Sequence, residues 1–224
     1  MRKQNKQSLV RPLLMLVFLV AFTRSPAPVT AQRRATLVPP PGTWLLDLQL
    51  HGNPQKINVT LPGEKKPRTY WYLLYTVTNN TGQDVNFYPQ IDLFTDTFLV
   101  YRAENNVRRV VFEAIRKRYA TTIPLLEPQN RVTGRLLVGE DNARDSVAIF
   151  EDFDPKSNAV KIFIGGLSSE IVKIKTPTIL NTQPDKPQET LLRRSLMLEY
   201  QVPGDSLNPS ARVMLYQKRS WVLR

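Results

Sequence analysis

Cysteine is absent from the 224 residues of the chain, and this absence excludes several kinds of chemistry. The protein has no disulfide, no thiolate metal site and no cysteine nucleophile. No cysteine follows the apolar segment near the N-terminus, which excludes a lipid-anchored lipoprotein. A chain of this length needs no such cross-links, because it can bury about 70% of its unfolded surface. We therefore expect its stability to come from an apolar core.

Histidine and the signatures of common enzymes are also scarce. The single histidine, His51, lies beside Gly52, Asn53 and Pro54, and no acid nearby would orient it as a catalytic triad requires. We expect an exposed turn histidine. The chain lacks a Gly-x-Ser-x-Gly elbow, a phosphate loop and a His-Glu-x-x-His helix. These absences favour a protein that is not an enzyme, although a glycosidase needs only two carboxylates that approach in space.

The N-terminus has the pattern of a secretory signal peptide. Residues 1–11 contain four basic residues and no acid, and Leu13–Phe22 is a run of ten apolar residues. A membrane-spanning helix needs about 20 apolar residues, so the run is too short. Val29-Thr30-Ala31 has the small residues of a cleavage site. We predict a signal peptide over residues 1–31 and export to the periplasm, the cell surface or the medium; an uncleaved signal that anchors the chain to the membrane is the alternative.

Much of the positive charge belongs to this signal. The net charge is +12, but the signal holds five cations and no acid, which leaves 26 cations and 19 anions, or +7, in the mature chain. Such an excess favours association with anionic wall polymers, lipid headgroups or polysaccharides. The alternative is a soluble surface on which both signs are mixed.

The mature chain is predicted to begin with a linker and to continue as one β-rich domain. The linker spans residues 32–42 and contains three consecutive prolines, and the domain spans residues 43–224. Tyr70–Thr78 is the strongest strand signal, because it is almost wholly aromatic and β-branched. We expect it to be a central strand. The turn residues 79–82 then predict a hairpin to a partner strand over Val85–Tyr88.

One amphipathic helix is predicted between about Asn106 and Arg118, with Asn105 or Asn106 as its N-cap. The remaining strands are predicted at Thr43–Leu50, Lys56–Leu61, Ile91–Thr95, Phe98–Arg102, Thr133–Val138, Ser146–Phe150, Ala159–Ile164, Glu170–Lys175, Ser195–Val202 and Arg212–Leu223. The proline-rich segment 176–189 is predicted to be a long exposed loop. About ten such strands favour a mainly-β fold, an immunoglobulin-like β-sandwich or a related barrel, with the helix packed on it.

Segments spread over nearly the whole mature chain carry a family resemblance. They are Trp71–Gly82, Phe87–Gln90, Thr95–Thr97, Val111–Ile115, Gly139–Asp145, Gly165–Ser168 and Trp221–Arg224. The chain resembles a group of exported proteins, without assigned activity, from planctomycete-type bacterial genomes. Val77–Val85 and the later Gly-Gly turn are also similar to immunoglobulin-like modules of bacterial surface lipoproteins. The resemblance implies an exported bacterial protein and supports the fold, but fold does not fix function.

The best candidate binding site is the basic surface of the predicted helix, formed by Arg108, Arg109, Arg116 and Lys117. It suits a polyanion. The alternative is a solvated helix face whose basic C-terminal end opposes the helix dipole. No groove-reading motif or interleaved exposed aromatics are evident, so we expect no nucleic-acid partner. The expected partner is an envelope polymer or another envelope protein, with membrane contact only if the signal is not cleaved.

Two weaker candidates come from local clusters. The acids of Gly139–Asp145 and Glu151–Asp154 bracket a strand and offer oxygen ligands to calcium, but they do not follow EF-hand spacing. A polar loop, with Arg144 paired to Asp141 or Asp145, is the alternative, and we expect no metal or cofactor. The aromatic set Tyr70, Trp71, Tyr72 and Tyr75 suits either a sugar or peptide groove or the core.

The sequence as a whole favours an exported, non-catalytic β-sandwich module with a structural or interaction role in the cell envelope. The alternative function is a hydrolase that acts on envelope glycans. The two differ in one structural feature, because a glycan hydrolase needs two carboxylates that converge in a concave pocket.

Overall fold

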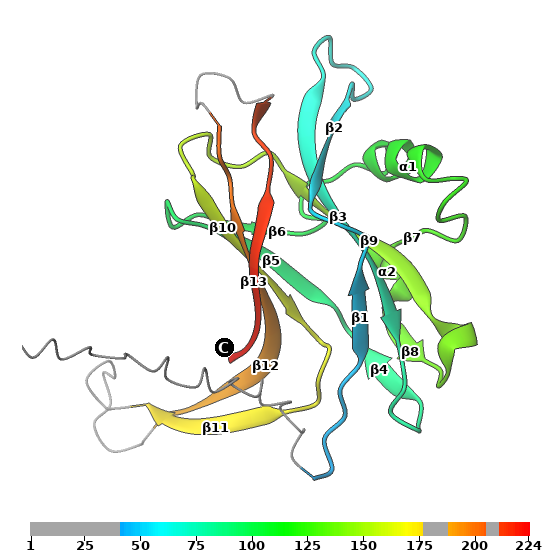
Figure 1. The fold of residues 1–224 in the computed structure, drawn as a ribbon, viewed down its shortest axis with the longest axis vertical. Coiled ribbons are helices and arrows are strands. Elements are labelled where there is room, and N and C mark those ends of the chain that lie inside the picture. The colour runs from blue at the N-terminus through cyan, green and yellow to red at the C-terminus, as the bar shows by residue number, and fades with distance from the viewer. Residues whose placement is uncertain (1–40, 177–187, 205–210) are drawn as a thin grey trace, which may run out of the picture. The chain divides into compact units, whose positions relative to one another are not determined.

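The computed structural model describes residues 41–176, 188–204 and 211–224 (Figure 1). The predicted signal peptide, most of the predicted linker and most of the proline-rich connection lie outside the described residues. The described residues belong to one compact unit. None of their helices is both long enough and apolar enough to cross a membrane.

The described residues form thirteen strands, two α-helices and one 3-10 helix. The strands are β1 (Asp47–Leu50), β2 (Gln55–Val59), β3 (Arg68–Thr78), β4 (Val85–Phe87), β5 (Gln90–Thr95), β6 (Val100–Arg102), β7 (Glu127–Pro128), β8 (Gly134–Leu136), β9 (Arg144–Glu151), β10 (Ala159–Gly165), β11 (Ile171–Thr176), β12 (Gln188–Gln201) and β13 (Leu215–Leu223). The helices are α1 (Arg109–Arg118), α2 (Gln129–Val132) and the 3-10 helix η1 (Glu140–Asn142).

The strands form two larger sheets and one small one. In the first sheet β3 is central, because β9 pairs with one of its edges while β1 and β2 pair with opposite ends of the other. β7 adds to β9 in parallel. In the second sheet β12 lies between β10 and β13, and β5 and β6 follow β10. β11 pairs with the first half of β12, and β4 pairs with β8.

The core lies between the two larger sheets. Trp71, Leu73, Tyr75 and Val77 of β3 share one buried cluster with residues of β5, β10 and β12. These four side chains occupy one face because successive residues of a strand point to opposite sides. The mainly-β fold that the sequence predicts is therefore confirmed, and the two larger sheets pack face to face, which is consistent with a β-sandwich.

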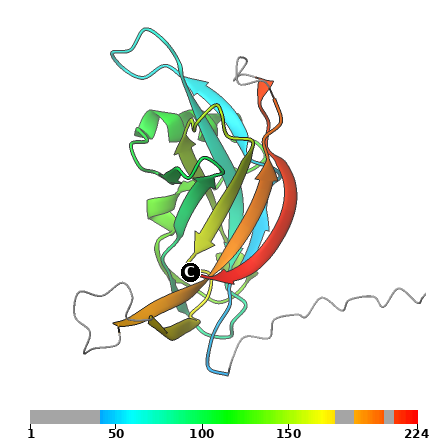
Figure 2. The same ribbon diagram turned by 90° about the vertical axis from the view of Figure 1, so that its left-hand side faces the viewer.

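The opposite face of the first sheet is covered by α1. Tyr70, Tyr72 and Leu74 pack in a second cluster with residues of α1, among them Phe112 and Ile115. Figure 2 shows α1 against the first sheet, on the side away from β12 and β13. β3 is thus buried on both faces, which explains why its sequence is an almost unbroken apolar run rather than an alternating one.

The predicted pairing of the strand near Val85–Tyr88 with Tyr70–Thr78 is wrong. β4 pairs with β8 instead, because both edges of β3 are occupied by β1, β2 and β9. The side-chain amide of Asn79 fixes this direction by donating to the carbonyls of Gln83 and Leu136, each at 2.9 Å. The turn is present as predicted, but it leads the chain to the small sheet.

The predicted helix also begins later than expected. α1 starts at Arg109, and its N-cap is Arg108, which makes no side-chain capping hydrogen bond. Neither Asn105 nor Asn106 caps it. Asn106 has a φ of +57°, in the left-handed region that a right-handed helix does not use. Besides the later start, the structure adds the short helix α2, and its strands outnumber the ten or so expected.

The turn between β5 and β6 contains a residue with a strained backbone conformation, and the energy of this strain can be measured. Phe98 has a φ of +64° and is 94% exposed. A bulky residue in the left-handed region is strained, whereas asparagine tolerates it. We expect Phe98→Asn to raise the free energy of unfolding by about 0.5–1 kcal/mol, measured by urea denaturation. Phe98→Leu, which keeps a bulky side chain, should bring no gain; an equal gain in both variants would refute backbone strain as the cause.

Candidate functional site

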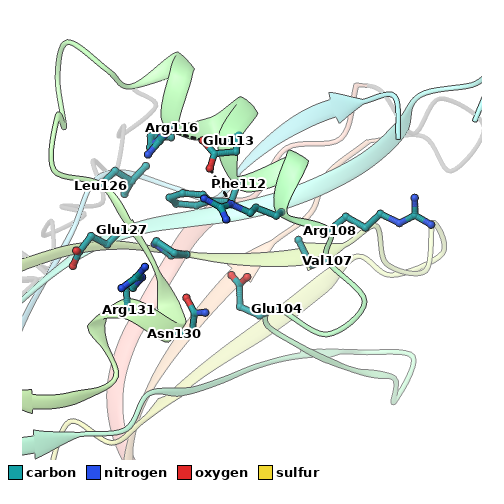
Figure 3. Close-up of a pocket in the computed structure, with 12 residues that line it drawn as sticks. Glu104, Val107, Arg108, Phe112, Glu113, Arg116, Leu126, Glu127, Asn130 and Arg131 are labelled. Carbon is teal, nitrogen blue, oxygen red and sulfur yellow. Dashed lines mark hydrogen bonds and ion pairs between the residues drawn. The ribbon is translucent and has the colours of Figure 1, made fainter. Parts of the chain in front are cut away.

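The basic helix forms one wall of a cleft on the first sheet. α1 is held on the sheet by Val111, Phe112 and Ile115, and the chain then returns through Leu126 to β7 and α2. A cavity of about 640 Å³ lies between α1 and the β7–α2 segment (Figure 3). Its apolar part comes from Val107, Phe112 and Leu126.

Four arginines line this cleft. Arg108, Arg109 and Arg116 come from α1 and its N-cap, and Arg131 comes from α2. The first three belong to the predicted binding surface. Arg131 does not, since nothing in the sequence except its positive charge connects it with the helix. It makes no hydrogen bond or ion pair within the described part of the chain.

Glu113 organises two of these arginines. Its carboxylate lies 3.3 Å from Nε of Arg109 and 2.6 Å from a terminal nitrogen of Arg116, one turn to either side on α1. Arg108 donates to the carbonyl of Pro62 at 3.3 Å. Exposed pairs of this kind contribute little to stability, so the guanidinium groups remain able to bind a ligand.

Lys117 lies outside the cleft. It lines a neighbouring depression with Arg116, Ala120 and Pro124, and among the described residues it has no bonding partner. Arg118 turns toward the sheet and donates to the hydroxyl of Tyr72 at 3.0 Å. The predicted set is therefore divided: three arginines line the cleft, and Lys117 extends the positive surface along the helix.

Glu104 lies at the bottom of the cleft, and sequence reasoning gave no sign of it. Its carboxyl points toward Phe112 (Figure 3). Burial raises the pKa of this carboxyl to about 7, although a hydrogen bond from the Ile149 backbone lowers it in part. That N–H donates to Oε1 at 3.3 Å, and the Glu104 backbone N–H donates to the Ile149 carbonyl at 2.9 Å. Glu104 thus satisfies the free edge of β9 beyond β7.

Two further carboxylates line the cleft. Glu113 is engaged by the two arginines of α1, and Glu127 lies 3.5 Å from Arg144. The expected pairing of Arg144 with Asp141 or Asp145 is therefore wrong. Figure 3 shows the Glu127 side chain directed away from Glu104. Several carboxylates share the cleft, but Glu104 and Glu127 do not point at one common position.

The prediction of an exposed turn histidine is also wrong. His51 is half-buried, and its Nε2 lies 2.7 Å from Oγ1 of Thr76, which in turn donates to Asp145 at 2.5 Å. Because the hydroxyl proton goes to Asp145, Nε2 is the donor to Thr76. A catalytic triad has the opposite arrangement, in which the histidine accepts the proton and the acid contacts the histidine. The network therefore links the His51 turn to β3 and β9 as a structural element.

Neither weaker candidate forms a site. Tyr70, Trp71, Tyr72 and Tyr75 are each at most 1% exposed, so they belong to the core and line no groove. Within the part of the chain that the structure describes, no three acids or histidines gather as metal ligands would. Asp152 instead accepts a hydrogen bond from Nε1 of Trp71 at 2.9 Å.

Comparison with protein-family models, curated proteins and solved structures finds no match. The candidate site is therefore characterised by its own geometry. It is a cleft lined by apolar side chains and four arginines, with the buried carboxyl of Glu104 at its bottom. Such a lining is suited to holding phosphate, sulfate or carboxylate groups, because guanidinium groups bind these anions through paired hydrogen bonds.

Proposed function

We propose that the chain is an exported, non-catalytic module with an immunoglobulin-like β-sandwich fold, and that it binds an anionic polymer of the cell envelope through α1. The observation that carries this proposal is the cleft between α1 and the β7–α2 segment, with Arg108, Arg109, Arg116 and Arg131 in its lining. Export is supported by the sequence pattern of residues 1–31 and by the resemblance to exported planctomycete-type proteins.

The spread of the charge favours a polymer over a single small anion. α1 has ten residues and is about 15 Å long. Its cations continue from the cleft to Lys117 on the outer side of the helix. A chain of repeated anionic groups can contact several of them at once, and linked weak contacts add to a high overall affinity. A single phosphate or carboxylate would use only part of this surface.

The partial pairing within the site is compatible with binding. Arg109 and Arg116 share one carboxylate, Glu113, so two cations have one counter-charge. Arg131 and Lys117 have no partner among the described residues. The surface around α1 is therefore left with uncompensated positive charge that an anionic polymer can neutralise.

The test is binding of the mature chain, starting at Gln32, to heparin as a model anionic polysaccharide. We expect Arg109→Gln/Arg116→Gln/Lys117→Gln to weaken binding at least about tenfold at physiological salt, a loss of about 1.4 kcal/mol. Affinity would be measured by calorimetry, and salt-gradient elution would confirm that the contact is electrostatic, since salt screens exposed charges.

A matched variant controls for net charge. Lys156→Gln/Lys161→Gln/Lys218→Gln also removes three cations, all exposed, on or next to strands of the second sheet, and outside the cleft lining. We expect less than threefold weakening in this variant. Equal losses in both triple variants would mean that heparin responds only to overall charge, and the α1 site would be rejected. Circular dichroism would verify that both variants fold.

A hydrolase acting on envelope glycans is the second candidate, because Glu104 shares the cleft with two other carboxylates. A carboxyl that is still protonated near neutral pH can act as a general acid, and the pKa of Glu104 is raised to about 7. Glycosidases also need a second carboxylate directed at the same bond, and Glu127 faces away from Glu104. The binding module is therefore the better-supported function.

A further inference from the structure

A second cavity lies apart from α1 and shares no lining residue with the first. Its volume is about 760 Å³, within the range of about 300–1000 Å³ that is typical of small-ligand pockets. The β4–β5 connection forms one wall and the β10–β11 turn forms another. Trp44, β12 and Arg224 complete the lining.

The base of this cavity is tightly built. Gly166 passes so close to Tyr88 that a β-carbon on it would lie 2.3 Å from the Tyr88 carbonyl oxygen. Asp92 is only 2% exposed and is held by Arg102 at 3.2 Å and Arg224 at 2.7 Å. The Arg224 guanidinium also lies against the rings of Phe94 and Phe163. One side of the cavity is therefore tightly packed, and the negative charge of Asp92 is neutralised by two arginines.

Several polar groups in the lining have no partner among the described residues. They are the amide of Asn86, the hydroxyls of Tyr88 and Ser195, and the guanidinium of Arg193. The ring of Tyr88 is 61% exposed, whereas Ser195 is only 5% exposed. Unbonded hydrogen-bonding groups beside aromatic rings, gathered in one cavity, are what a polar ligand with apolar faces requires.

We propose that this cavity binds a short saccharide that carries a carboxylate. The aromatic faces of Tyr88 and Trp44 can pack against the C–H face of a sugar ring, because an aromatic side chain offers an apolar surface with a polar edge. Asn86 and Ser195 can exchange hydrogen bonds with sugar hydroxyls. Arg193 supplies the cation for the carboxylate, and Asp92 offers no repulsion because two guanidinium groups already neutralise it.

The test is a glycan array of uronate-containing oligosaccharides and their neutral counterparts, probed with the mature chain. We expect retention of uronate-containing members. The affinity of the strongest binder, measured by calorimetry, should fall at least tenfold in Tyr88→Ala and in Arg193→Gln. Phe98→Ala removes an exposed aromatic residue elsewhere and should change the affinity less than twofold. The triple variant of α1 should also keep its affinity.

Each other outcome would overturn the proposal. No retained saccharide, or equal binding of the neutral counterparts, would exclude a carboxylate-bearing saccharide. Unchanged affinity in folded Tyr88→Ala and Arg193→Gln would place the saccharide elsewhere. A loss of saccharide affinity in the α1 variant alone would place the saccharide in the first cleft. The proposed binding of an anionic polymer by α1 would then still stand. Since Tyr88 and Arg193 are both exposed, both variants should melt within a few degrees of the wild type.

Discussion

Gly166→Ala is expected to lower the free energy of unfolding by about 3 kcal/mol. Gly166 has a φ of +86°, which costs alanine about 1 kcal/mol. The added β-carbon would also lie 2.3 Å from the Tyr88 carbonyl oxygen and 2.8 Å from its carbonyl carbon. Both are backbone atoms, so two chain segments must move apart. This movement costs about a further 1–3 kcal/mol. Urea denaturation measures the sum.

Gly63 provides a matched control. Its φ is +87°, and a β-carbon there would meet no atom within 4 Å. Gly63→Ala should therefore cost about 1 kcal/mol, or a fall of about 2–4 °C in melting temperature for a domain of this size. Similar costs at both positions would show that the close approach to Tyr88 contributes nothing. The displacement of Tyr88 in Gly166→Ala should also weaken saccharide binding at the second cavity.

Local sequence was sufficient to predict most of the elements. The central strand was recognisable because Tyr70–Thr78 is aromatic and β-branched throughout, and burial of both faces of β3 requires such a sequence. Trp71, Leu73, Tyr75 and Val77 share one buried face of this strand, because successive side chains of a strand point to opposite sides. The amphipathic pattern of α1 was equally easy to recognise in the sequence, since its apolar residues must face the sheet.

Strand pairing was less accessible from the sequence. The residues after β3 have turn chemistry, and a hairpin was the simplest interpretation. The structure instead fills both edges of β3 with β1, β2 and β9, and β1 and β9 come from segments far apart in the chain. A local pattern contains no information about which distant strand occupies an edge. The start of α1 was missed for a related reason, because the left-handed backbone at Asn106 has no compositional marker.

The candidate sites also contain residues that local sequence predicts and residues that only the fold brings together. Three of the predicted site residues, Arg108, Arg109 and Arg116, line the cleft because one short segment places them on the same helix. Arg131 and Glu104 come from other segments, and only the packing of α1 on the first sheet brings them into the same cleft lining. The second cavity draws residues from five separate parts of the chain, so no sequence spacing could indicate it.

Glu104→Gln is expected to stabilise the protein at alkaline pH by up to about 3 kcal/mol. The pKa of Glu104 is raised by burial from 4.5 to about 7. Below pH 4.5 the carboxyl is protonated in both the folded and the unfolded chain, so it adds no pH dependence. Between these values only the unfolded chain loses its proton, so stability falls as pH rises. Above pH 7 both forms are ionised and the loss stays constant, at about 1.4 kcal/mol per pKa unit.

Glutamine keeps an acceptor for the Ile149 N–H and has no charge, so the stability difference between variant and wild type isolates this ionisation. This difference in the free energy of unfolding, measured by urea titrations, should grow from pH 4.5 to pH 7 and then level off. The exposed Glu140→Gln should change stability by less than about 0.5 kcal/mol at pH 8. A difference for Glu104→Gln that does not vary with pH would show that Glu104 ionises as readily in the fold as in the unfolded chain.

The same variant separates the two candidate functions. In a binding module, ionised Glu104 adds a negative charge to the cleft that Arg109, Arg116 and Arg131 also line, so the wild type should bind heparin more weakly at pH 8 than at pH 6. Glu104→Gln should lose much of this difference because its side chain is neutral at both values. A glycosidase that uses Glu104 as its general acid would behave differently, since the variant would lose glycan cleavage despite its higher stability. Activity and stability would then move in opposite directions, whereas polymer binding and stability should both improve at pH 8.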